Sequence, residues 1–82
     1  MNIDQAMAMV FDEYTRAQKW PAMNSAHEGY RVILEEVDEL WDEIKLGQNA
    51  RYLDKMTKEA AQVAAMAVRF LVDICNESRI HR

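Results

Sequence analysis

Apolar residues recur every three or four positions along most of the chain, which is the spacing of a helix with one buried face. The first such segment covers residues 3–19 and is followed by Trp20-Pro21. Proline cannot continue the helical hydrogen-bond ladder, and it disfavours helical geometry at the residue before it. We therefore predict a first helix over residues 3–19 and a short linker over 20–25.

A second helix is predicted to begin at a capping box. In this motif the Ser25 hydroxyl serves an amide of the first turn, and the Glu28 carboxylate reaches back to the start of the helix. The apolar pattern then continues to residue 46, just before Gly47. Because glycine readily adopts the left-handed conformation that ends helices, we predict a second helix over residues 26–46.

The third segment is long, since no proline or glycine interrupts the chain after Ala50. We predict a helix over residues 50–78, capped by Asn49, and leave open a break near residues 55–58. Five alanines in this segment would let a neighbouring helix approach closely: Ala60, Ala61, Ala64, Ala65 and Ala67. No strand pattern occurs. The expected fold is all-α, a single domain over residues 1–82 with about three antiparallel helices.

The length and the net charge of the chain limit the classes of function that it can have. A chain of 82 residues buries only about 60% of the surface of its unfolded state, so we expect homo-oligomerisation to complete the bundle. The chain carries 10 basic and 14 acidic residues, a net charge of −4, and no basic stripe. This balance argues against a domain that grips polymeric nucleic acid. A nucleotide substrate is compatible with this charge balance if a metal ion binds its phosphates.

The single cysteine, Cys75, excludes a disulfide framework and a cysteine-based metal site. Asp4 lies within the first residues, and no long apolar run follows it. The pattern therefore predicts neither a signal peptide nor a membrane span. A soluble, cytoplasmic protein is the expectation.

The second predicted helix contains the densest charge in the chain, six carboxylates within residues 35–43. Acidic residues three or four positions apart on a helix are neighbours, and each such pair costs about 0.2–0.5 kcal/mol. A divalent cation bound between the carboxylates would relieve the repulsion. The alternative is a solvated acidic face, which is the usual meaning of a charge run.

Two pairs of polar residues are predicted to meet across the last two helices. A short connection makes these helices antiparallel neighbours. Glu36 and Glu39 lie about 12–17 Å from that connection along one helix, at 1.5 Å per residue. Glu59 and Gln62 lie about 15–20 Å from it along the other. Oxygen donors without cysteine or histidine select Mg²⁺ or Mn²⁺ over zinc.

Residues 35–39 resemble the EExxE motif of the MazG-like all-α nucleoside triphosphate pyrophosphohydrolases, a superfamily that includes dimeric dUTPases and dCTP pyrophosphatases. The second motif of that superfamily, ExxD, aligns with residues 59–62, which read Glu-Ala-Ala-Gln. The resemblance covers roughly residues 26–75. It implies a helical bundle, usually a homodimer or a dimer of dimers. It also implies Mg²⁺-dependent hydrolysis of a nucleoside triphosphate to the monophosphate and pyrophosphate, as nucleotide-pool housecleaning.

Carried over by position, the resemblance makes Glu36, Glu39 and Glu59 metal ligands, with Gln62 where the family has aspartate. A glutamine carbonyl can ligate a cation, but the site loses one negative charge and gains an amide donor. The site is then either retuned or inactive. The alternative function is therefore a catalytically silent helical dimerisation, nucleotide-binding or regulatory module.

The rest of the acidic block divides by its position on the helix. Glu35 or Glu39 is the candidate catalytic base, and Glu43, one turn further along, is a reserve carboxylate for a second ion. Asp38 and Asp42 are expected to face solvent.

Three further residues are candidates for substrate binding. Lys58 would steer an anionic substrate, Arg69 would contact a phosphate and Trp20 would stack on a base. Each has a structural alternative: a solvated helix start for Lys58, an ion pair with Asp73 for Arg69, and core packing for Trp20, which lies at a helix end near a loop. Trp41 falls on the apolar stripe and is predicted to be core, and His27 is expected to be exposed.

Overall fold

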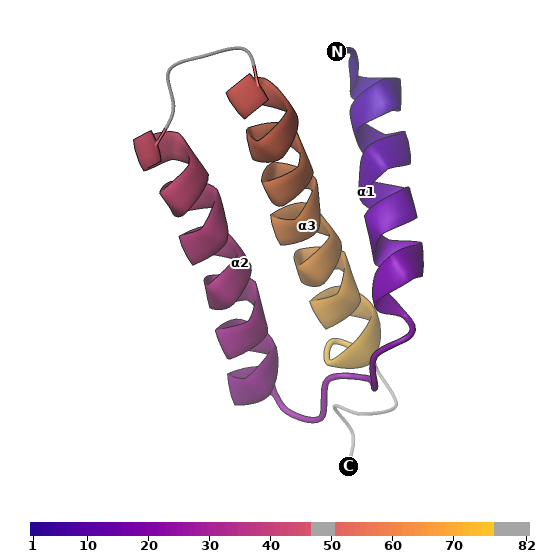
Figure 1. Cartoon of the computed structure of the whole chain (residues 1–82). Coiled ribbons are helices and arrows are strands. Elements are labelled where there is room, and N and C mark those ends of the chain that lie inside the picture. Colours follow the sequence, from indigo (N-terminus) through magenta and orange to yellow (C-terminus); the bar gives the residue numbers. More distant parts are fainter. Residues whose placement is uncertain (47–50, 77–82) are drawn as a thin grey trace.

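The chain forms three helices in the computed structural model, which describes residues 1–46 and 51–76, with only the backbone at 51 and 52. The helices are α1 (Ile3–Ala17), α2 (Ala26–Leu46) and α3 (Arg51–Asp73). The described residues contain no strand, so the predicted all-α class is confirmed. α3 lies in the middle and packs against both neighbours, whereas the described parts of α1 and α2 do not pack against each other (Figure 1). No described helix has the length and apolar character of a membrane span.

α1 is shorter than predicted. It begins with a capping box between Asn2 and Gln5, whose side chains each accept a hydrogen bond from the other's backbone amide at 2.9 Å. It ends at Ala17 instead of residue 19, because the amides of residues 18–20 bond to carbonyls three positions back, not four. This tightened last turn carries the chain into the linker.

α2 has the predicted bounds. The Ser25 hydroxyl accepts a hydrogen bond from the Glu28 amide at 3.1 Å, as the capping box requires. The Glu28 carboxylate reaches back to the amide of Asn24, at 3.4 Å, one residue before the expected partner. The predicted roles of Gly47 and Asn49 lie outside the described residues.

α3 runs without a break through residues 55–58 and ends at Asp73, so the prediction of helix over residues 74–76 is wrong. The amide of Cys75 bonds to the Phe70 carbonyl at 3.2 Å, which closes the last turn. The Asp73 carboxylate accepts the Met23 amide at 3.0 Å and so ties the end of α3 to the linker before α2.

Small residues set the distance between the helices. Ala61 and Ala65 of α3 are buried, which confirms the expected close approach. Gly29 of α2 lies so close to α3 that a Cβ atom there would sit 2.6 Å from Phe70 Cδ2 and 3.1 Å from Met23 Sδ. The N-terminal half of α2 can approach α3 this closely because residue 29 has no side chain.

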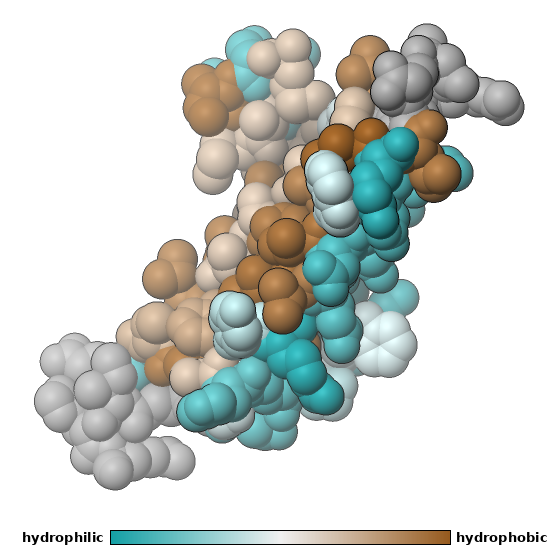
Figure 2. Space-filling model, turned by 90° about the vertical axis from the view of Figure 1, so that its left-hand side faces the viewer, coloured by the Kyte–Doolittle hydropathy of each residue, from teal (hydrophilic) through white to brown (hydrophobic). Residues whose placement is uncertain are grey.

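The apolar core is small and much apolar surface is exposed. Among the described residues the buried apolar side chains are Met23, Ala61 and Ala65. The prediction that Trp41 is core is wrong, because it is 54% exposed, with Lys45 Nζ 5.8 Å from its ring centre. Figure 2 views the molecule from the side of α2 and shows an apolar band running beside a hydrophilic one. The three helices therefore form one layer with an uncovered apolar side.

Candidate metal and nucleotide site

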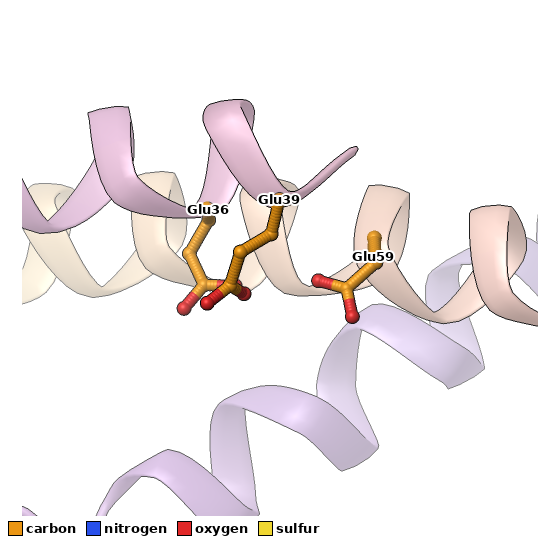
Figure 3. Close-up of side chains that lie close together, drawn as sticks. All are labelled: Glu36, Glu39 and Glu59. Atoms are coloured by element: carbon orange, nitrogen blue, oxygen red, sulfur yellow. The ribbon is translucent and has the colours of Figure 1, made fainter. Parts of the chain in front are cut away.

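Three carboxylates converge where α2 packs on α3. Glu36 and Glu39 lie about one turn apart on α2, and Glu59 reaches toward them from α3 (Figure 3). One oxygen of each lies within 4.8 Å of an oxygen of the other two. Oxygens bound to one Mg²⁺ at about 2.1 Å lie roughly 3–4 Å apart, so small side-chain rotations would complete such a site. The spacing thus brings these residues together as predicted, and their metal-binding role stays a prediction.

Burial and neighbouring negative charges disfavour the ionised form of two of these carboxyls. Burial, followed by the charges and hydrogen bonding of Glu39 and the charges of Glu59 and Glu35, raises the pKa of Glu36 to about 7. Burial is also the main cause that raises the pKa of Glu59, with Glu39 and Glu43 adding to it and Lys58 opposing it. A bound cation favours the ionised form and would reverse these shifts.

The amide of Gln62 lies among carboxylates from all three helices. With its nitrogen toward the cluster, it donates to Glu36 Oε2 at 3.0 Å and to Glu59 Oε2 at 3.2 Å. In the opposite orientation the nitrogen donates to Glu13 Oε2 at 3.4 Å. The first orientation gives two hydrogen bonds to carboxylate oxygens, and both are shorter than the single bond of the second orientation. Gln62 therefore occupies the edge of the cluster, where it can donate to carboxylates or present its carbonyl to a cation.

Glu13 of α1 is the acidic residue at this site that sequence reasoning missed. Its side chain is only 12% exposed, and it accepts a hydrogen bond from Arg16 Nη1 at 2.6 Å. The helical period places Glu13 on the polar side of α1. Nothing in the sequence indicates that this side faces Gln62, because the path of α1 depends on contacts made by the linker.

A groove of about 660 Å³ adjoins the cluster, between α1 and α2 and over α3. Its charged lining is Glu13, Glu28, Glu36, Arg16, Lys19, Lys58 and Arg69, with Gln62 beside them. Its other lining residues are Ala17, Trp20, Pro21, Met23, Val32 and Met66. The groove thus combines carboxylates, cations and an apolar surface, which are the features needed for a metal ion, phosphates and a flat ring.

The guanidinium group of Arg69 donates hydrogen bonds to other residues of the chain. It is 7% exposed, and its Nη1 donates to the Ala17 carbonyl at 2.6 Å. Its Nη2 donates to the carbonyls of Trp20 and Pro21 at 2.6 and 2.7 Å, and its Nε donates to Asp73 at 3.2 Å. The alternative that Arg69 pairs with Asp73 is confirmed. These four bonds use most of the guanidinium donors, so the structure favours a linker-holding role over phosphate contact.

The other predicted substrate residues lie on the groove wall. Lys58 is exposed beside Glu59, and Trp20 is 62% exposed in the linker after α1, with Lys19 Nζ 5.3 Å from its ring centre. Glu35, the candidate base, is exposed on α2 and near enough to Glu36 to raise its pKa. Asp38, Asp42 and His27 are exposed, as expected.

The residues present fit a hard divalent cation, because three carboxylates and an amide oxygen from two packed helices can face one point. No known protein family, curated protein or solved structure matches the chain. The resemblance to the MazG-like superfamily therefore rests on the sequence of residues 35–39 and 59–62 alone.

Proposed function

We propose that the chain is a Mg²⁺-dependent nucleoside triphosphate pyrophosphohydrolase of the MazG-like type, which converts a (d)NTP to the (d)NMP and pyrophosphate. Mn²⁺ is the other cation that the donor set suits. The observation that carries the proposal is the convergence of Glu36, Glu39 and Glu59. They lie beside a groove that is also lined by lysine and arginine side chains and by the ring of Trp20. We place the activity in cytoplasmic nucleotide-pool housecleaning and in an oligomer, a homodimer or a tetramer.

The proposal assigns roles to the residues of the cluster and the groove. Glu36, Glu39 and Glu59 hold the cation, which when bound neutralises phosphate charge and orients the triphosphate for in-line attack. Lys58 attracts the phosphates from the groove wall, and Trp20 offers its exposed ring to the base.

The catalytic base is a carboxylate beside the cluster. Glu35 or Glu39 accepts the proton of the attacking water, since both are exposed and lie next to the other ligands. Gln62 can donate to a carboxylate or to a phosphate oxygen.

One observation favours the alternative function, a catalytically silent nucleotide-binding or regulatory module. The Gln62 amide donates to Glu36 and Glu59 and so relieves part of their repulsion without a cation. Aspartate at this position would do the opposite. Nucleotide binding without turnover, with turnover gained by Gln62→Asp, would support this alternative.

The test is release of pyrophosphate from a panel of dNTPs and NTPs with Mg²⁺ or Mn²⁺. Glu36→Gln and Glu39→Gln should each lower the rate by about 100-fold or more, since each removes a ligand charge. Asp38→Asn and Asp42→Asn are matched controls, because both are exposed acids of the same helix, and they should retain activity. Failure of every nucleotide to be cleaved, together with no binding of either cation, would overturn the proposal.

A further inference from the structure

The side-chain amide of Gln62 has carboxylate neighbours on both of its sides, and they belong to different helices. One terminal atom of the amide lies 3.0 Å from Glu36 Oε2 and 3.2 Å from Glu59 Oε2. The other terminal atom lies 3.4 Å from Glu13 Oε2, on α1. Ionised carboxylates only accept hydrogen bonds, and an amide has one donating and one accepting end. The amide nitrogen can therefore serve either side, but not both at once.

Without a cation, the nitrogen is favoured on the side of Glu36 and Glu59. There it donates two hydrogen bonds, whereas the amide oxygen in the same place would face two carboxylate oxygens without a proton between them. Gln62 is half-buried, so this repulsion is screened less than it would be in bulk water. Glu13 keeps its ion pair with Arg16 in either case.

A divalent cation in the cluster reverses this preference. Neighbouring oxygens bound to one Mg²⁺ at about 2.1 Å lie roughly 3 Å apart. The end of Gln62 that faces the cluster already has this separation from one oxygen each of Glu36 and Glu59. An oxygen at that place joins the three that Glu36, Glu39 and Glu59 supply. The nitrogen then faces Glu13, whose side chain is only 12% exposed.

We propose that Gln62 turns its amide over when a cation binds the cluster, so that its oxygen becomes a ligand and its nitrogen donates to Glu13. Glu13 is then a positioning residue, which holds Gln62 in the ligand orientation without itself touching the cation. The described parts of α1 and α2 do not pack against each other, so this hydrogen bond extends the site from α2 and α3 to α1. An aspartate at position 62 would have no donor for Glu13. The inference rests on the cation site of the proposed function.

The first experiment determines the orientation of Gln62 by NMR of the wild-type chain, at about pH 8 so that the carboxylates are ionised. With a chelator present, the Gln62 amide protons should show nuclear Overhauser contacts to the side chains of Glu36 and Glu59. Saturating Mg²⁺ should replace these contacts by contacts to Glu13. Gln62→Met identifies the signals, because it removes the amide and keeps a side chain of similar size. An amide with the same contacts in both conditions would overturn the proposal.

The second experiment measures the affinities for Mg²⁺ and Mn²⁺ by isothermal titration calorimetry. Glu13→Ala should weaken binding by about fivefold, the loss expected for one net hydrogen bond. In the Gln62→Met background the same change should weaken it by less than about twofold, because the amide through which Glu13 acts is absent. Asp12→Asn is the matched control, an exposed acid of the same helix, and should have less than about a twofold effect. Equal weakening by Glu13→Ala in both backgrounds would show that only its charge acts, and would overturn the proposal.

These measurements distinguish failure of the positioning role from failure of the proposed function. If neither cation binds to the wild-type chain, both are overturned. If a cation binds but the contacts of Gln62 stay the same, or the effect of Glu13→Ala does not depend on Gln62, only the positioning role is overturned. Circular dichroism checks that every variant stays helical.

Discussion

The two sides of α2 differ in what the rest of the chain provides for them. On the groove side, burial and, after it, the neighbouring carboxylates raise the pKa of Glu36 to about 7. On the opposite side of α2, the apolar residues Val37, Trp41 and Ile44 are each at least 40% exposed. One side has an excess of negative charge and the other an excess of apolar area. In the proposed function, a bound cation would relieve the first excess and a partner subunit would relieve the second, so chelators and dilution would separate the two effects.

The largest predicted effect comes from a substitution that detaches the linker between α1 and α2 from α3, on the groove side. Arg69→Ala removes the donor to three backbone carbonyls and leaves the half-buried Asp73 without its guanidinium partner. Breaking a buried charged pair in this way costs about 3–5 kcal/mol. The free energy of unfolding, from urea denaturation at one fixed protein concentration, should fall by this amount.

Arg16→Ala is the matched control for Arg69→Ala. Its ion pair with Glu13 joins residues three positions apart on one helix, and the Arg16 side chain is 66% exposed. Such a pair contributes less than about 1 kcal/mol. Similar losses in the two variants would contradict the linker-holding role of Arg69.

The sequence predicted the fold well where local rules decide the outcome. The period of apolar residues, Pro21 and the Ser25 capping box placed α2 within its observed bounds. Local rules failed at the end of α3, where the Asp73 carboxylate accepts the amide of Met23, 50 positions away. No pattern near residue 73 signals such a contact.

The candidate site was predictable in part for the same reason. Glu36, Glu39 and Glu59 lie on two helices joined by a short connection, so their heights could be counted from residue numbers. Glu13 could not be placed, since the linker and Arg69 decide where α1 lies. Trp41 was assigned to the core because periodicity identifies an apolar stripe without showing whether the covering surface belongs to the same chain.

A smaller effect should separate the two sides of α2. Gly29→Ala places a Cβ atom 2.6 Å from Phe70 Cδ2, and overpacking of this kind costs about 1–3 kcal/mol. The gain in helix propensity offsets about 1 kcal/mol, so the free energy of unfolding should fall by roughly 1 kcal/mol. As α2 moves away from α3, Mg²⁺ affinity should weaken, while the dissociation constant of the dimer should stay near the wild-type value. An unchanged Mg²⁺ affinity together with a weaker dimer would contradict this separation.

The last effect is a pH dependence that belongs to the groove side alone. The pKa of Glu36 is about 7 in the folded chain and lies near its ordinary value of 4.5 in the unfolded chain. Between these values the folded state holds the extra proton, so its stability falls as pH rises. The free energy of unfolding of the wild type, relative to Glu36→Gln, should therefore decline from pH 4.5 to about 7 in the presence of a chelator. Saturating Mg²⁺ should reduce the decline, because the cation binds the ionised carboxylate. Thermal or urea denaturation across this pH range measures the slope of relative stability against pH, once with the chelator and once with Mg²⁺. If the relative stability in the chelator rose with pH, the raised pKa of Glu36 would be contradicted.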